Sequence, residues 1–351
     1  MKKHHPDTTE NKTYCLLLAA GLGERMGEIG KFLPKPLWPV FDKTLLEMQI
    51  NYALDLNSNF KIDHLFINTH KNHQQIHQFL LEKQLLSNVT LLHEPELLDI
   101  GGAIHNLAAR PSINYDGNLL VINSDQFLFF DFSTLKNALL ELSLKLTPVI
   151  LFGIDVDTHL GHNELQLKNQ CYLSAIRKNS EIPRSTKSIL TYSGMSLIKL
   201  NALAPVSGKS PFFTSVANYL DKNILIKTIS NSEAEYWDFG TLPRYYHSVC
   251  KLFDLLTKKN CSIFVNFLKN HHCFTPSKLS AALSSYGLTD NTTPHLLNFS
   301  AYPCAIADKG PSGTGNHFRI ILQQACADDA STVIDHHQGL YYRKIKTAIP
   351  Y

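Results

Sequence analysis

The chain has 351 residues, of which 44% are hydrophobic and 18% are charged, and these proportions are typical of an ordinary globular protein. They exclude a disordered, collagen-like or coiled-coil chain. The sequence holds 33 Lys and Arg residues and 30 Asp and Glu residues, so the formal net charge is +3. This excess is too small to favour a nucleic acid or a membrane surface as the partner. The length allows two domains, or one large domain with an appendage.

No apolar run approaches the roughly 18 residues that a membrane-spanning helix needs. The first apolar stretch, residues 15–20, is too short for the apolar region of a signal peptide. The 7 cysteines are an odd number, lie far apart and form no C-x-x-C pair, so neither a disulfide framework nor a four-cysteine zinc site is indicated. The sequence therefore predicts a cytoplasmic protein with reduced thiols.

Short apolar runs alternate with helical patterns from Tyr14 onward. Strands are predicted over residues 14–20, 64–70, 89–93, 118–123 and 148–154, and helices over residues 74–81, 103–109 and 132–142. This alternation predicts an α/β fold with an open, mixed, mostly parallel sheet of the Rossmann-like type and helices on both faces. Ligands of such sheets bind beyond the carboxyl ends of the strands, so we expect functional residues directly after the strands.

Two glycines, Gly21 and Gly23, follow the first predicted strand and let the backbone approach a phosphate closely. A dinucleotide fingerprint would need a third Gly at Met26, and a Walker A loop would need a final Gly-Lys-Ser/Thr, so neither motif is present. Arg25 follows the loop, and Lys35 lies between two prolines that stiffen the chain around its ammonium. The glycines alone favour a simpler interpretation, a turn followed by a solvated basic loop.

The sequence here resembles the nucleotidyltransferases that join a nucleoside triphosphate to a sugar 1-phosphate. The segments LLLAAGLGERM at residues 16–26 and PKPLWPV at residues 34–40 are similar to the family's opening signature, L-A-A-G-x-G-x-R-M followed by P-K-P-L-x-P-V. Later segments keep the family's order: EPELLDIGGAI at 94–104, LVINSD at 120–125, YSG at 192–194, and YWDFGT at 236–241 with RY at 244–245. The resemblance spans about residues 14–250 and leaves roughly the last hundred residues unexplained.

The resemblance implies that Arg25 and Lys35 are catalytic and that Asp125 and Asp238 hold Mg²⁺. The chemistry of the two aspartates agrees, because Asp125 ends an apolar strand and Asp238 lies between two aromatic residues, where a carboxylate is expensive to bury without a cation. Mg²⁺ usually keeps water and substrate phosphate oxygens as its other ligands. Taken singly, each aspartate is more often a cap or a turn residue.

The reaction implied is attack by a sugar-phosphate oxygen on the α-phosphorus of the triphosphate, with release of pyrophosphate. Positioning and charge neutralisation carry most of such catalysis, because both reactants are anions. The resemblance places the nucleotide against Leu18, Ala20, Gly21, Gly23, Glu94, Gly101 and Gly102. On the sugar-phosphate side it implies Asn123, Lys178 and Gly194.

Three of these positions carry a simpler alternative. Asn can bind a sugar hydroxyl and Gly can leave room for a ring, but without the resemblance Asn123 and Gly194 would be interpreted as structural. Lys178 is the nearest candidate for the family's phosphate-binding lysine. Its context is RKN at residues 177–179 instead of the family's E-K-P, and a solvated surface lysine is the alternative.

The chain departs from the family after the third predicted strand. Relatives commonly read L-G-T-G-G or L-G-T-A-G where this chain reads LDIGG at residues 98–102, so Asp99 replaces a Gly and Ile100 replaces a hydroxyl residue. A side chain then stands where backbone approaches the base, which leaves the identity of the base open. The alternative for Gly101 and Gly102 is a turn before the helix predicted from Ala103.

Residues 251–351 are predicted to be a small α+β appendage. They contain no short repeat of constant period, so the left-handed β-helix that ends many longer relatives is not expected. Helices are expected over residues 275–285 and 318–327. Their apolar faces predict docking on the catalytic domain or on a second copy of the chain, which would give a homo-oligomer. The histidine-containing segments at 271–273 and 335–337 meet no zinc spacing.

The sequence thus predicts a flexible N-terminus over residues 1–11, a nucleotidyltransferase domain over residues 12–250 and the appendage. The expected partners are an NTP and a sugar 1-phosphate, with Mg²⁺ as cofactor and neither nucleic acid nor membrane. The resemblance is nearest to mannose-1-phosphate guanylyltransferase-like members, followed by the members that make UDP-N-acetylmuramic acid from its 1-phosphate. A catalytically silent nucleotide-sugar sensor that regulates a partner is the alternative of another class.

Overall fold

The computed structural model describes residues 12–24, 30, 33–41, 43–144, 147–230, 232–257 and 262–273, together with four strands of the C-terminal region. Three predictions lie outside these residues: the N-terminal segment 1–11, the candidate catalytic residue Arg25, and the helix expected over residues 275–285. Within the described part of the chain, no helix combines the length and the apolar character that crossing a membrane requires.

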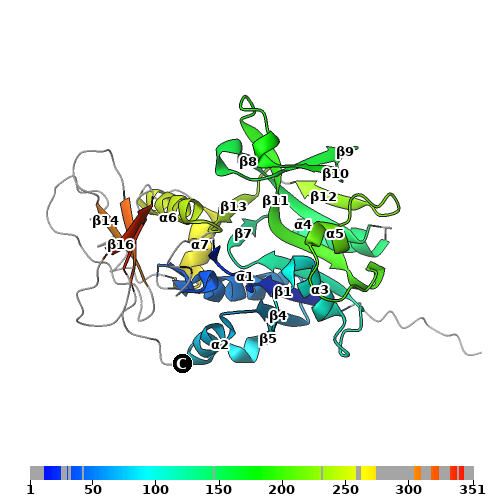
Figure 1. Cartoon of the computed structure of the whole chain (residues 1–351), viewed down its shortest axis with the longest axis horizontal. Coiled ribbons are helices and arrows are strands. Elements are labelled where there is room, and N and C mark those ends of the chain that lie inside the picture. Colours follow the sequence, from blue (N-terminus) through cyan, green and yellow to red (C-terminus); the bar gives the residue numbers. More distant parts are fainter. Residues whose placement is uncertain are drawn as a thin grey trace, which may run out of the picture.

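A nine-stranded mixed sheet forms the centre of the protein, in the order β5-β4-β1-β6-β11-β8-β12-β10-β9 (Figure 1). Its strands are β1 Thr13–Leu18, β4 His64–Thr69, β5 Thr90–His93, β6 Asn118–Asn123, β8 Val149–Asp157, β9 Glu164–Lys168, β10 Tyr172–Arg177, β11 Ser188–Lys199 and β12 Ile226–Ser230. The pairs β1–β4, β1–β6 and β4–β5 are parallel, whereas β11 runs antiparallel to β6 and β8. The predicted α/β fold is confirmed.

Helices cover both faces of this sheet. They are α1 Leu45–Asn59, α2 His73–Glu82, α3 Asp99–Ala108, α4 Phe132–Leu144, α5 Phe212–Ser215, α6 Leu242–Thr257 and α7 Ile263–Asn270. Alternate side chains of β1 enter different cores, because successive residues of a strand point to opposite faces. Leu17 packs in the core that α1, α2, α4, α6 and α7 complete, and Leu16 packs in the core that α3 and α5 complete.

Two short ribbons lie outside the main sheet and position the candidate site. β2 Pro39–Val40 pairs with β3 Lys43–Thr44, and β7 Gln126–Phe129 pairs antiparallel with β13 Glu235–Asp238. The β7–β13 register connects the end of β6 to the segment that precedes α6. Residues from two distant parts of the sequence therefore meet at the carboxyl edge of the sheet.

Helix α3 begins earlier than the sequence predicted. The expected turn before Ala103 is wrong, because α3 starts at Asp99 and takes Gly101 and Gly102 into its first turns. Close packing explains the glycines: a Cβ on Gly101 would lie 2.3 Å from Ser215 Oγ, and a Cβ on Gly102 would lie 2.5 Å from the carbonyl oxygen of Gly208.

The C-terminal region contains a second sheet. Its strands are β14 Cys304–Lys309, β15 Phe318–Gln323, β16 Val333–His337 and β17 Leu340–Arg343, in the order β14-β15-β17-β16. The helix expected over residues 318–327 is therefore wrong. β15 pairs antiparallel with β14 and parallel with β17, and such long-range pairing overrides a short apolar run that fits either period.

The region after residue 250 contributes to the core around the main sheet. Phe264 on α7 is fully buried, and its ring centroid lies 5.0 Å from that of Phe127 and 5.0 Å from that of Trp237. The N-terminus of α7 is also fixed, because Glu235 accepts hydrogen bonds from Ser262 Oγ (2.5 Å) and from the backbone N–H of Ile263 (2.6 Å). The boundary at 250 stays a prediction, but this packing favours a folded unit that extends to Cys273.

We predict that Phe264→Ala lowers the free energy of unfolding by about 3–5 kcal/mol, because it removes a buried ring between aromatic neighbours. The neighbouring Ile263→Ala is the control, since Ile263 is 50% exposed and its loss should change the stability by less than about 0.5 kcal/mol. Urea denaturation measures both. Equal, small effects would mean that α7 does not stabilise the core around the main sheet.

Candidate active site

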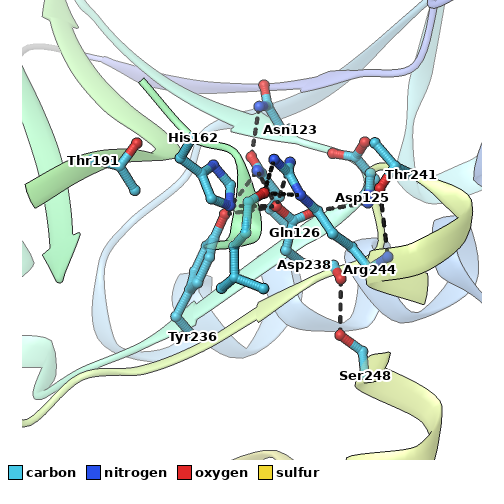
Figure 2. A network of polar contacts seen from close by, with 12 residues as sticks. Asn123, Asp125, Gln126, His162, Thr191, Tyr236, Asp238, Thr241, Arg244 and Ser248 are labelled. Atoms are coloured by element: carbon cyan, nitrogen blue, oxygen red, sulfur yellow. Dashed lines mark hydrogen bonds and ion pairs between the residues drawn. The ribbon is translucent and has the colours of Figure 1, made fainter. Parts of the chain in front are cut away.

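The two candidate metal ligands meet at the β7–β13 ribbon (Figure 2). β6 ends at Asn123 and β7 begins at Gln126, so Asp125 lies in the tight turn between the two strands. The ribbon register places Asp238 opposite Gln126, and the backbone N–H of Phe239 donates to the carbonyl of Asp125 (2.8 Å). The structure therefore brings together two aspartates that the sequence separates by more than a hundred residues.

Lys35 reaches this place from a segment that packing holds in position. It begins the 3₁₀ turn Lys35–Leu37, and the fully buried indole of Trp38 anchors the turn by donating to the carbonyl of Leu33 (3.2 Å). The Lys35 ammonium forms an ion pair with Asp125 Oδ2, and only 15% and 12% of the two side chains are exposed. Three of the residues singled out from the sequence thus form one cluster.

Asp238 is surrounded by hydrogen-bond donors. Its Oδ1 accepts from the backbone N–H of Gly240 (2.6 Å). Its Oδ2 accepts from Arg244 Nη1 (3.0 Å), Gln126 Nε2 (3.3 Å) and the hydroxyl of Tyr236 (3.3 Å). Arg244 is the counter-charge of this carboxylate, as Lys35 is that of Asp125.

The two carboxylates border one small space. A methyl group on Gly240 would lie 2.8 Å from Asp238 Oδ1 and 3.2 Å from Asp125 Oδ2. Oxygen ligands from two carboxylates, with substrate phosphates and water as the rest, suit Mg²⁺, so this donor set fits the predicted cofactor. Among the described residues there is no group of three or more His, Cys, Asp and Glu side chains that could hold a metal by itself.

Two titratable neighbours of Asp238 are kept neutral. Burial lowers the pKa of His162, and the Arg244 guanidinium lowers it further against the opposing effect of Asp238. Burial raises the pKa of Tyr236 well above its usual range, and the carboxylates of Asp238 and Asp125 add to the shift. Tyr236 therefore stays a hydrogen-bond donor at neutral pH, and Arg244 supplies the positive charge beside Asp238.

An amide pair closes the sugar side of the cluster. Asn123 Nδ2 donates to Gln126 Oε1 (2.7 Å), and Gly194 lies against both. Gly194 has φ +86°, and a Cβ there would lie 2.0 Å from Gln126 Oε1 and 2.7 Å from Asn123 Nδ2. The space beside Gly194 is thus filled by these amides and not open for a sugar ring. Sequence reasoning missed Gln126, Tyr236, His162 and Arg244 as members of the cluster, although YWDFGT and RY were noted as family segments.

Lys178 lies apart from this cluster in the described contacts. It is exposed at the start of a 3₁₀ turn after β10, where its backbone N–H donates to Glu181 Oε2 (3.3 Å). Its role toward a sugar phosphate stays a prediction. His271, from the disfavoured zinc segment, is paired with Asp55 through Nε2 (2.8 Å).

Buried hydrogen bonds connect the loops on the nucleotide side. Asn68 Oδ1 accepts from the backbone N–H of Ala19 (2.8 Å), and Asn68 Nδ2 donates to Glu94 Oε1 (2.8 Å). Glu94 Oε2 accepts from the N–H of Leu98 (3.2 Å). Burial raises the pKa of Glu94, and these bonds oppose the rise. Glu94 is 1% exposed. Through these hydrogen bonds, Glu94 and Asn68 connect the loop after β1 to the end of β4 and to the loop after β5. Sequence reasoning missed Asn68, because nothing in its local sequence marks it.

Comparison with known proteins agrees with this geometry. Residues 14–159 match the family model described as nucleotidyl transferase. This match covers less than half of the 351 residues of the chain. The chain is 31% identical over 171 residues to the bifunctional sugar-1-phosphate nucleotidylyltransferase/acetyltransferase of Sulfurisphaera tokodaii, a match that covers 49% of this chain and 38% of the relative. It is 29% identical over 123 residues to the D-glycero-alpha-D-manno-heptose 1-phosphate guanylyltransferase of Campylobacter jejuni, covering 35% and 52%.

The chain thus spans about half the length of these relatives or less. Among solved structures, HddC from Yersinia pseudotuberculosis superposes with a TM-score of 0.55 at 20% identity, over 68% of this chain and 99% of that protein. HddC complexed with GMP-PN gives a TM-score of 0.52 at 19% identity over the same shares. These likenesses show the nucleotidyl transferase fold.

The glycines that the sequence predicts to bind the nucleotide differ in their access to solvent. Gly101 and Gly102 are buried, and the N–H of Gly102 already donates to the carbonyl of Ser210 (3.0 Å). Gly21 is exposed, and the half-buried Gly23 has φ +71°, a left-handed conformation that favours glycine. The loop after β1 is therefore the part of the predicted set that a phosphate can approach. Leu18 and Ala20, half-buried and buried, flank it.

Asp99 stands in a glycine-type conformation where relatives have Gly. Its φ is +60°, in the left-handed region, and its Oδ1 accepts from the N–H of Ile100 (2.7 Å). Asp tolerates this region better than most residues because its short side chain bonds to nearby backbone. The chain thus has a backbone conformation that favours glycine at this position, while Asp99 places an exposed carboxylate at the start of α3.

We predict that Asp99→Ala lowers the free energy of unfolding by about 1 kcal/mol, whereas Asp99→Gly changes it by less than about 0.5 kcal/mol, because Gly adopts positive φ without strain. Asp116 is the matched control: its Oδ1 also accepts from the next N–H (2.9 Å, Gly117), but its φ is not positive. At Asp116, substitution by Ala should lower the free energy of unfolding less than substitution by Gly. Urea denaturation of the four variants measures the order, and the same order at both sites would contradict the strain argument.

Proposed function

We propose that the protein is a sugar-1-phosphate nucleotidyltransferase, which transfers a nucleotidyl group from an NTP to a sugar 1-phosphate and releases pyrophosphate. One observation carries the proposal: two buried carboxylates, Asp125 and Asp238, border a single small space, and Lys35 reaches it from the segment after the glycine loop. This combination suits two anionic substrates that react with a divalent cation between them.

Each residue of the cluster has a proposed task. Asp125 and Asp238 would hold Mg²⁺, which supplies charge neutralisation and orientation of the phosphates when it is bound. Lys35 neutralises charge that develops on the triphosphate, and the backbone around Gly21 and Gly23 cradles its oxygens. The expected task of Arg25 is the same as that of Lys35.

The sugar side depends on groups around β6 and β11. Asn123 is fixed by Gln126 and offers its remaining amide positions to a sugar hydroxyl. Gly194 serves by admitting that amide pair. Lys178 keeps its proposed role as the lysine for the sugar phosphate, which it would reach from its exposed turn.

For the substrate we propose GTP and a manno-configured sugar 1-phosphate, in the manner of mannose-1-phosphate guanylyltransferases. The relative named for heptose 1-phosphate guanylyl transfer and the HddC structure complexed with GMP-PN support a guanine nucleotide. Transfer of UMP to N-acetylmuramic acid 1-phosphate remains the alternative substrate. The proposed compartment is the cytoplasm, and a homo-oligomer through the C-terminal region remains a proposal.

A silent nucleotide-sugar sensor is the second candidate, because both oxygens of Asp238 accept hydrogen bonds from protein donors and Asp99 departs from the family pattern. Pyrophosphate release separates the two functions. The full chain should be incubated with GTP, UTP, dTTP, ATP or CTP, each with several sugar 1-phosphates and Mg²⁺. Release with one pair, highest for GTP, supports the enzyme. Nucleotide-sugar binding without any release would support the sensor.

The metal assignment predicts that excess EDTA stops pyrophosphate release and that added Mg²⁺ restores it. Asp125→Asn and Asp238→Asn should each abolish turnover, because the shape is kept while the counter-charge of the cation is lost. Both variants should keep their circular dichroism spectra. Wild-type-like release by both variants, or by the wild type in EDTA, would contradict the assignment.

Lys35→Met should lower kcat/KM by about two to three orders of magnitude, because charge on the phosphates is then left uncompensated. Lys43→Met is the matched control, since Lys43 also pairs with one carboxylate, that of Glu47, in the same part of the chain. It should stay near the wild-type value. Steady-state kinetics with pyrophosphate detection compares the two variants. Equal losses of kcat/KM would mean that Lys35 contributes only as one basic residue among others.

A further inference from the structure

Arg244 connects the candidate metal ligand Asp238 to a loop on the other side of the site. It lies in the first turn of α6, and its Nη1 donates to Asp238 Oδ2 (3.0 Å). The other side of the same guanidinium donates twice to the carbonyl of Leu160, from Nε (3.1 Å) and from Nη2 (2.6 Å). Figure 2 shows the Arg244 side chain beside Asp238. The side chain is 17% exposed, so it is fixed but reachable from solvent.

This arrangement leaves Asp238 Oδ2 without a free lone pair. A carboxylate oxygen accepts about two hydrogen bonds, and Oδ2 already has three donors, from Arg244, Gln126 and Tyr236. Oδ1 accepts one hydrogen bond, from the N–H of Gly240, and keeps an acceptor position toward Asp125. A metal ion that binds Oδ1 alone meets a carboxylate whose charge Arg244 already compensates, and one that binds both oxygens must displace a donor from Oδ2. Among these three donors, only Arg244 carries a positive charge that would also repel the ion.

Asp125 shows the same arrangement with a different cation. Its Oδ2 is paired with Lys35. The two carboxylates and the two basic side chains compensate one another. The immediate charge that a divalent cation would meet is thus near zero. It becomes negative only when a basic side chain transfers its contact from a carboxylate to another anion.

We propose that Arg244 is a positioning residue that occupies Asp238 until an anionic phosphate draws its guanidinium away, so that the metal and the phosphate bind cooperatively. The inference rests on the proposed function, because it takes Asp238 as a metal ligand and a phosphate as the second anion. Arg suits this exchange, since its planar fork binds carboxylate and phosphate oxygens in the same way. The carbonyl of Leu160 keeps the guanidinium near the site while its Nη1 changes partner.

The test measures Mn²⁺ binding to the full chain, from the electron paramagnetic resonance signal of free Mn²⁺, with and without saturating inorganic phosphate. In the wild type, phosphate should raise the Mn²⁺ affinity by about tenfold, a coupling of the usual size between two sites. In Arg244→Gln, Mn²⁺ alone should bind about tenfold more tightly than in the wild type, and the gain from phosphate should fall to about threefold or less. Arg110→Gln, an exposed arginine that none of these contacts involves, should match the wild type.

The ratio of the Mn²⁺ affinities with and without phosphate distinguishes this role from the simple removal of a positive charge. If Arg244→Gln tightens Mn²⁺ binding equally in both conditions, or leaves it unchanged, the proposal is overturned. The wild-type measurement tests the proposal even if Arg244→Gln does not fold. If phosphate does not raise the Mn²⁺ affinity of the wild type, the proposal is also overturned. Asp238→Asn tests the premise that Asp238 is a metal ligand. Unchanged Mn²⁺ binding in this variant would contradict that premise and the proposed function. Lost Mn²⁺ binding in Asp238→Asn, together with wild-type coupling in Arg244→Gln, would contradict the role of Arg244 alone.

Discussion

Two carboxylates that share one small buried space set the conditions for the residues around them. Asp125 and Asp238 are 9% and 8% exposed, and a carboxylate at such a depth requires a counter-charge or several donors. Lys35 comes from the segment after β1 and Arg244 from the start of α6, so the tertiary structure that joins these distant segments is needed to compensate both carboxylates. The charge balance of the site and the tertiary structure therefore depend on each other.

The β7–β13 ribbon separates a polar face from an aromatic one. Gln126 and Asp238, opposite each other in the register, belong to the charged cluster, while their strand neighbours Phe127 and Trp237 pack against Phe264 of α7. Successive side chains of a strand point to opposite faces, so neighbouring residues of the ribbon can belong to the polar face and to the aromatic face. A rigid aromatic layer beneath the ribbon holds the polar groups above it at fixed distances, as a preorganised site requires.

Sequence reasoning identified the fold class and five strands of the main sheet, β1, β4, β5, β6 and β8, because buried strands have clear apolar runs. It also singled out Lys35, Asp125 and Asp238, because the segments that resemble the family occur in order. It did not identify Gln126 or the positive φ of Asp99, since both depend on what lies opposite them in three dimensions. The helix expected at 318–327 failed for the same reason: strand pairing with distant segments decided the structure of a run that local pattern left ambiguous.

Glu235 connects the start of α7 to the strand that carries Asp238. Its two carboxylate oxygens bind the first turn of that helix, and Asp238 lies three residues further along the same strand. At about 3.3 Å per residue, the anchor of α7 and the buried aspartate are roughly 10 Å apart on one extended backbone. A displacement of the first turn of α7 would therefore be transmitted to Asp238 along three residues of one strand.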